Sequence, residues 1–237
     1  MNTKFNDDYT SNNDFSTISN NICDISWIPE GKKVTAISFD DGPVYDSDNA
    51  VRIFNALKEN GFHATFFYWG EKIHEAPEEI RLARKLGFEI GNHAWTHPDL
   101  RNLDDKGFEE IEKCRKELGK VLSEDAHYLL RPPYLAYDEG VMKAAGVPLI
   151  TCRIDTEDWN NASKEMIFDR LNNALEDGTI ENSIVLCHVP LSTTADAIEE
   201  FLPVLKSKGY INVSISEMFK LNSSPLLPGK VYSCCEP

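Results

Sequence analysis

Asp40 and Asp41 are two adjacent carboxylates that directly follow the apolar segment "VTAISF". Neighbouring like charges raise one another's pKa and destabilise a fold unless a cation lies nearby. Gly42 and Pro43 come next and are typical of a tight turn. The pair therefore indicates either a capped turn at a helix entrance or a site where one carboxylate binds a cation.

The segment "HAWTH" offers the other ligands that a metal cation needs. It places His93 and His97 at positions i and i+4, so on one helical turn both imidazoles lie on the same face. Such a pair is more often incidental when it stands alone. With a carboxylate from a neighbouring strand end, it becomes the two-histidine, one-carboxylate set of a catalytic divalent-metal site. The sequence therefore predicts that one of the two aspartates binds a metal ion.

More polar side chains follow other apolar segments of the chain. Arg131 ends "HYLLR", Asp155 and Asp158 follow "LITCRI", and His188 ends "SIVLCH". From Gly31 onward, seven apolar segments alternate with amphipathic stretches, several of which end at glycine. This alternation predicts a parallel α/β sheet, and seven strands are enough to curl into a barrel. The polar residues would then share the carboxyl rim, where such folds keep their active sites.

Charge and composition limit the classes of partner. The 237 residues carry a net charge of −15, which argues against nucleic acid and against an anionic membrane, and which suits a neutral substrate such as a sugar. No apolar stretch has the length of a membrane span, and the N-terminus lacks the apolar core of a signal peptide. The polar segment 1–30 is interpreted as a linker or tail, and 31–237 as one catalytic domain, an arrangement that would fit a piece of a modular enzyme.

The six cysteines show no metal-binding spacing. Cys152 and Cys187 lie in apolar segments and are expected to be buried thiols. Cys23 and the pair Cys234–Cys235 lie at opposite ends of the chain and could form a disulfide if the protein is exported. The sequence leaves this pairing open.

The ordered motifs resemble those of the polysaccharide deacetylases, the NodB-homology domain of carbohydrate esterase family 4. The resemblance runs from about Val34 to Phe219. It rests on "SFDDGP" (38–43), "HAWTH" (93–97), "RPPY" (131–134), "DTEDW" (155–159) and "VLCH" (185–188), which occur in the order of the family. It implies a distorted (β/α) barrel. One position departs from the pattern: Ala94 stands where the family usually has a serine or threonine whose hydroxyl would brace the metal loop.

The resemblance also implies roles for the residues singled out above. Asp41, His93 and His97 would hold one divalent metal ion, zinc or cobalt being the first expectations. Asp40 would then be the general base that takes a proton from the water that the metal activates. His188 would be the general acid that protonates the leaving group.

The remaining motif residues receive supporting roles from the same resemblance. Arg131 would keep Asp40 ionised, although a plain rim salt bridge is the alternative. The backbone N–H of Tyr134 would help to hold the oxyanion. Asp158, in preference to Asp155, would orient His188. Trp159 would offer a flat face to a sugar ring, and Leu186 would line an acetyl pocket, although each is also compatible with simple packing.

The implied function is hydrolysis of acetyl groups on a carbohydrate polymer. Acetylxylan is the first expectation, because the ending "LPGKVYS" and the polar leader resemble the acetylxylan-esterase branch. N-deacetylation of chitin oligomers or peptidoglycan is the alternative, since both reactions need the same groups. We expect a secreted monomer. Non-haem iron oxygenases share the ligand set, but they are typically built on antiparallel double sheets, and a catalytically inactive binding relative would not need a general acid.

Overall fold

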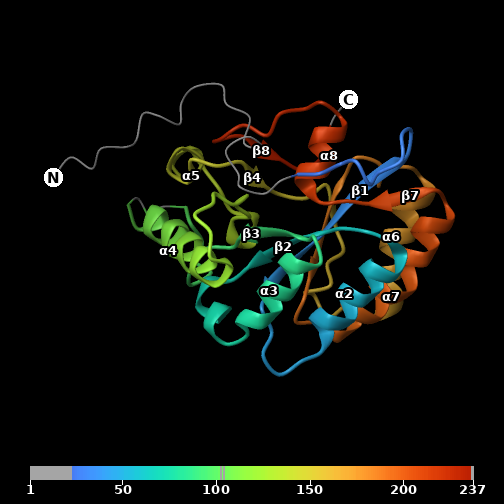
Figure 1. Ribbon diagram of the computed structural model, residues 1–237, viewed down its shortest axis with the longest axis horizontal. Helices are drawn as coiled ribbons and strands as arrows, with labels where there is room; N and C mark the ends of the chain where they lie inside the picture. Colours follow the sequence, from blue (N-terminus) through green and yellow to red (C-terminus); the bar gives the residue numbers. More distant parts are fainter. Residues whose placement is uncertain (1–22, 102, 104, 236–237) are drawn as a thin grey trace.

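Parallel strands and the helices that connect them form an α/β fold in this computed structural model, which describes residues 23–235 apart from 102 and 104 (Figure 1). The strands are β1 (Lys33–Gly42), β2 (Thr65–Tyr68), β3 (Glu89–Asn92), β4 (Leu149–Ile150), β5 (Ile154–Asp155), β6 (Ile184–His188), β7 (Tyr210–Asn212) and β8 (Val231–Tyr232). The α-helices are α2 (Asn49–Asn60), α3 (Pro77–Lys85), α4 (Asp105–Leu122), α5 (Glu139–Ala145), α6 (Lys164–Glu176), α7 (Ser192–Ser207) and α8 (Ile215–Leu221). Two short 3-10 helices are η2 (Gly70–His74) and η3 (Pro133–Leu135).

The sheet confirms the parallel architecture predicted from the alternation. Its strand order is β3-β2-β1-β6-β5, with β7 also pairing with β1, and every pairing is parallel. Strands β4 and β8 form a second parallel pair. Single bridges at Leu130, to Asn92 and to Leu149, connect this pair to β3, and an antiparallel bridge joins Ser183 to Cys234. The sheet therefore curls into a distorted barrel-like arrangement whose strands end at a common rim.

Strand β1 lies at the centre and is buried on both faces, as expected for a strand of a parallel sheet covered on both sides. Ile37 and Phe39 pack into a core with helices α2, α3, α6 and α7. Ala36, with the opposite side-chain direction, packs into a second core inside the curled sheet. Asp40 has the same direction as Ala36 and therefore faces the inside of the barrel.

Helices cover the outer face of the sheet. Helices α2, α7 and α6 lie side by side, and α3 and α4 continue the layer beyond β2 and β3 (Figure 1). Helix α2 ends at Gly61, whose φ of 71° is the left-handed conformation that glycine adopts without strain. The amino ends of α6 and α8 are capped by the hydroxyls of Ser163 and Ser214. None of the described helices is both long and apolar enough to cross a membrane.

Three parts of the fold differ from the sequence expectations. The expected fourth strand, "HYLLRPP", contributes only the bridging residue Leu130, because two prolines end the ladder after Arg131. The expected fifth strand, "LITCRID", divides into β4 and β5, which pair with different neighbours. Strand β8 and helices α5 and α8 were not predicted.

The polar segment expected to be a linker is described only from Cys23 onward, and residues 1–22 lie outside the described part. Ile28 is buried in the inner core, and the indole N–H of Trp27 donates to Glu217 at 2.8 Å. Residues 23–30 therefore lie against the body of the domain. All six cysteines are free thiols in this structure, including the buried Cys187.

Candidate active site

Asp41, His93 and His97 converge at the carboxyl rim of the sheet. One ligand atom from each lies within 4.8 Å of the others. The Nε2 atom of His93 lies 3.5 Å from Oδ1 of Asp41, and that of His97 lies 3.4 Å from the same oxygen. This set can hold one divalent cation and leaves coordination positions open.

An irregularity at the end of β1 explains how two adjacent aspartates reach one site. Neighbouring side chains of a regular strand point to opposite faces of the sheet. Here the pairing with β2 shifts register between Phe39 and Gly42, and Asp41 has a φ of 69°. The carboxylates of Asp40 and Asp41 consequently both face His93, at 3.6 and 3.5 Å from its Nε2 atom.

The segment His93–His97 is an irregular loop after β3, so the helical turn predicted for it is wrong. Ala94 and His97 have φ angles of 61° and 58°, which a helix does not allow. Both imidazoles still reach Asp41. The backbone oxygen of Arg131 accepts a hydrogen bond from Nδ1 of His93 at 2.7 Å, which leaves the Nε2 lone pair available for a metal.

The electrostatics of Asp41 and His97 fit a cation. Oδ1 of Asp41 is buried and has no hydrogen-bond partner among the described residues. Burial alone would raise the pKa of Asp41, but the imidazole of His93, 3.5 Å away, with the charges of His188 and His97, lowers it below its usual range. Burial, followed by the charge of His93, lowers the pKa of His97. An ionised carboxylate and a neutral imidazole are the forms that bind metals.

Asp40 belongs to a separate ion pair. Its Oδ1 atom accepts from Nη1 of Arg131 at 2.8 Å, and both side chains are almost completely buried. The guanidinium of Arg131 also lies 4.2 Å from the ring centroid of Phe67, which fixes its plane. This ion pair balances the charge of Asp40 and leaves the carboxylate of Asp41 available to a metal ion.

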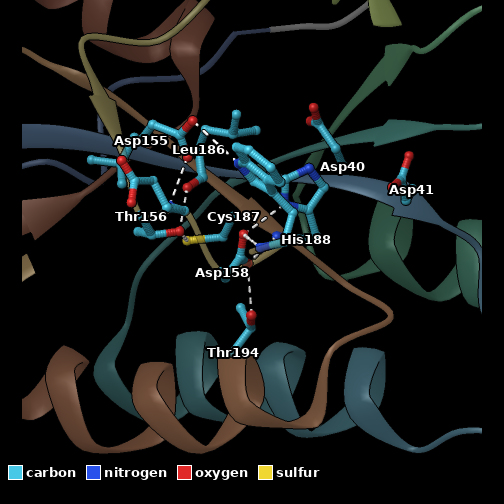
Figure 2. A network of polar contacts seen from close by, with 12 residues as sticks. Asp40, Asp41, Asp155, Thr156, Asp158, Leu186, Cys187, His188 and Thr194 are labelled. Atoms are coloured by element: carbon cyan, nitrogen blue, oxygen red, sulfur yellow. Dashed lines mark hydrogen bonds and ion pairs between the residues drawn. The ribbon is translucent and has the colours of Figure 1, made fainter. Parts of the chain in front are cut away.

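His188, at the end of β6, is held by Asp158. Figure 2 shows Asp158 between His188 and Thr194: its carboxylate accepts from the imidazole Nδ1 of His188 and from its backbone N–H, both at 2.7 Å, and from the hydroxyl of Thr194 at 2.6 Å. Burial tends to lower the pKa of His188, but Asp158, with smaller contributions from Asp40 and Asp41, raises it to about 9. With Nδ1 held by Asp158, Nε2 is the atom that can exchange a proton with a substrate.

The other residues singled out in the sequence lie around this centre with different contacts. Tyr134 is exposed, and its ring centroid lies 4.8 Å from that of His97. It follows two prolines in the chain and has a φ of 58°. Asp155 accepts from the indole N–H of Trp159 at 3.3 Å, whereas the imidazole of His188 bonds to Asp158. Trp159 is 58% exposed, whereas Leu186 is buried in β6. Asp155 therefore orients the exposed indole of Trp159.

Sequence reasoning missed three side chains that support the site. Thr194 contacts Asp158, Glu110 contacts the loop between the two histidines, and Glu79 accepts from the backbone N–H of Val44 at 2.8 Å. All three lie on helices and reach the site from at least 14 residues away along the chain. No local pattern marks them, because each is an ordinary polar residue of an amphipathic helix.

Known proteins resemble this chain in sequence and in fold. A family model described as polysaccharide deacetylase matches residues 28–149. The peptidoglycan-N-acetylmuramic acid deacetylase PdaC of Bacillus subtilis is 33% identical over 194 residues, which cover 81% of this chain and 40% of that protein. This chain thus spans about 40% of the length of the first curated relatives that it matches.

Two solved structures share the fold over most of both chains. That of PdaC from Bacillus subtilis has a TM-score of 0.77 at 29% identity, covering 83% of this chain and 94% of the other. The Xyl-CE4 domain of a multidomain xylanase from the hindgut metagenome of Trinervitermes trinervoides has a TM-score of 0.77 at 25% identity, covering 86% and 98%. The architecture of these proteins therefore extends across nearly all of the described residues.

Proposed function

We propose that this chain, which belongs to the polysaccharide deacetylase family, hydrolyses acetyl groups on a carbohydrate polymer with one divalent metal ion. The observation that carries the proposal is the meeting of three groups at one rim: the Asp41–His93–His97 cluster, the Asp40–Arg131 ion pair and the Asp158–His188 pair. A metal cluster alone would suit a structural site. The neighbouring carboxylate and imidazole, each held by its own partner, supply a base and an acid.

Each group at the rim has its own role in the proposed reaction. The ion held by Asp41, His93 and His97 would lower the pKa of a water molecule and polarise the acetyl carbonyl. Asp40, which forms an ion pair with Arg131, accepts the proton of the attacking water. The backbone N–H of Tyr134, which has no hydrogen-bond partner among the described residues, is available to the oxyanion. His188 then donates a proton from Nε2 to the departing amine or alcohol.

The substrate we place first is an N-acetylated amino sugar in a glycan chain. An amine must be protonated before it leaves, and the raised pKa of His188 keeps that proton available at neutral pH. The naming of the similar Bacillus subtilis protein as a peptidoglycan deacetylase supports the same class. Glycans of this kind lie outside the cell membrane, so an extracellular location is part of the proposal. Zinc and cobalt remain the metals proposed for the site.

Acetylxylan, the substrate that the sequence placed first, is the second candidate. The shared fold with a domain of a multidomain xylanase favours it. In either case Trp159 would stack against a sugar ring, and Leu186 would lie behind the acetyl methyl group. Trp159 follows Asp158, the residue that bonds His188, and Leu186 lies two residues before His188 in β6, so both roles are part of the proposal.

The test measures acetate release from N-acetylglucosamine oligomers, peptidoglycan and acetylxylan, with metal content determined on the same sample. We expect faster release from one of the N-acetylated substrates than from acetylxylan, loss of activity after chelation, and recovery when zinc or cobalt is added. Faster release from acetylxylan would select the second candidate. Full activity in protein shown to be metal-free would refute the proposal as a whole.

A further inference from the structure

The backbone of the loop that carries both histidine ligands forms hydrogen bonds with residues outside the loop. We call residues 93–97 the metal loop. The N–H of Ala94 donates to Oδ1 of Asn92, while the carbonyl oxygens of Ala94 and Trp95 accept from the N–H groups of Gly70 and Glu71, all at 2.9 Å. A side chain at Gly70 would collide with Trp95, because a Cβ there would lie 2.6 Å from the indole. The loop is thus packed closely on one side.

Glu110 of α4 holds the other side of the metal loop. One carboxylate oxygen, Oε2, accepts from the backbone N–H of Trp95 at 3.1 Å and from that of Thr96 at 2.7 Å. The other, Oε1, accepts from the hydroxyl of Thr96 at 3.1 Å. These three bonds reach the centre of the segment that separates the two ligands, and they satisfy two backbone donors that have no partner in a strand or helix.

Helix α4 is itself tied to the start of the loop. The side-chain amide of Asn92 donates to the backbone oxygen of Ile111 at 2.9 Å, while its oxygen binds the N–H of Ala94. The ammonium group of Lys113, one turn after Glu110, lies 4.0 Å from the ring centroid of Trp95. Helix α4 and the metal loop therefore meet at several points, of which Glu110 is one.

The backbone of the loop needs such support. Ala94 and His97 have φ angles of 61° and 58°, and residues other than glycine keep this conformation only where the surroundings impose it. We propose that Glu110 is a positioning residue that holds the metal loop in the conformation in which His93 and His97 bind a metal ion. The proposal rests on the metal site of the proposed function but not on any particular substrate.

The test is metal affinity, measured by titrating each metal-free variant with zinc against a chromophoric chelator. Glu110→Ala should weaken zinc binding by about 10- to 100-fold, the usual loss when a group that orients metal ligands is removed. Glu110→Gln should bind zinc within about threefold of the wild type, because its amide oxygen accepts both N–H groups and its NH₂ donates to the Thr96 hydroxyl. If Glu110→Ala is insoluble, Glu110→Asp, which is one methylene too short, carries the same expectation with a smaller loss.

The matched control is Glu112→Ala on the same helix. Glu112 is also partly buried and bonds a side chain, but its partner is Arg115 and not the metal loop. This variant should bind zinc as the wild type does. The proposal is overturned if Glu110→Ala keeps wild-type zinc affinity, if Glu110→Gln loses as much affinity as Glu110→Ala, or if Glu112→Ala loses as much. If the protein releases acetate from none of the tested glycans while the zinc affinities are as expected, the proposed function is refuted and the role of Glu110 is not.

Discussion

The two adjacent aspartates have different partners, so their substitutions should have different effects. Asp41 faces two imidazole nitrogens, whereas Asp40 pairs with the buried Arg131. A carboxylate that binds a metal and a carboxylate that accepts a proton cannot be exchanged. The register shift in β1 lets these two neighbouring residues face the same site with different partners.

The first prediction separates the two roles by metal content. Asp40→Asn should keep near-normal zinc content but lower kcat by about 10²- to 10⁴-fold, as removal of a general base does. Asp41→Asn should lose zinc affinity as well. Metal analysis and acetate release on the same preparations check this, with Asp155→Asn as a control that leaves zinc content unchanged. An empty metal site in Asp40→Asn would mean that the two roles are reversed.

The second prediction concerns pH and follows from the Asp158–His188 pair. His188 must be protonated to act as the acid, so activity falls as pH rises through its pKa, which Asp158 raises. Asp158→Asn removes that charge and should move the alkaline limb of the kcat profile to lower pH by about one unit or more. A bound metal ion would move the alkaline limb to lower pH in the wild type and in Asp158→Asn alike. The quantity to measure is therefore the pH difference between the alkaline limbs of the two proteins. An unchanged limb would assign it to a group other than His188.

At the scale of elements, loops after the strands are held by carboxylates from helices. Glu110 of α4 binds the metal loop, and Glu79 of α3 binds the N–H of Val44 in the loop after Asp41. A side chain at Gly42 would approach Glu79 to 3.0 Å, so the glycine allows this close contact. The site is therefore built from strand ends and from the helices packed beside them.

The third prediction is that Glu79 makes stability depend on pH. Burial raises the pKa of Glu79 to about 7, against the opposing hydrogen bond from Val44. Below about pH 4.5 the carboxyl is protonated in both the folded and unfolded chains. Between that pH and about 7, unfolding releases the proton, so the free energy of unfolding of the wild type falls as pH rises, by about 1–3 kcal/mol.

Glu79→Gln removes this titration while keeping an oxygen for the Val44 N–H. Its free energy of unfolding relative to the wild type should therefore increase between pH 4.5 and 7 and stay constant above pH 7. Urea denaturation at three pH values measures the difference. The exposed neighbour Glu78, substituted by glutamine, should show no such increase, and a flat difference for Glu79→Gln would contradict the assignment.

These elements also explain what the sequence can and cannot predict. The alternation of apolar and amphipathic segments predicts the parallel sheet, and the strand-end rule then places Asp40 and His188 at one rim. The spacing of His93 and His97 suggests a helical turn, but the structure has a loop, because tertiary hydrogen bonds override a local preference. Glu110 cannot be distinguished in the sequence from Glu109 or Glu112, since only the packing of α4 decides which carboxylate faces the loop.

At the scale of the whole molecule, the candidate active site and a polar network around Glu217 lie at opposite ends of the sheet. The metal cluster lies at the carboxyl ends of the strands. At the other end, Glu217 of α8 accepts from Trp27 and contacts Nδ1 of His63, each at 2.8 Å, and Trp27 packs 4.2 Å from the His63 ring. Parallel barrels commonly separate catalytic and stabilising ends in this way.

The last prediction tests that separation through Trp27, which joins the segment before β1 to the body of the domain. Trp27→Ala should lower the free energy of unfolding by about 1–3 kcal/mol, because it removes partly buried ring contacts and a hydrogen bond to a buried carboxylate. Trp27→Phe keeps a ring and loses only the N–H donor, so it should cost about 0.5–1.5 kcal/mol. Both should bind zinc as the wild type does, since Trp27 contacts Glu217 and His63 at the other end of the sheet. Urea denaturation and zinc titration measure the two properties independently. A loss of zinc affinity that tracks the loss of stability would show that the two ends are coupled through the sheet.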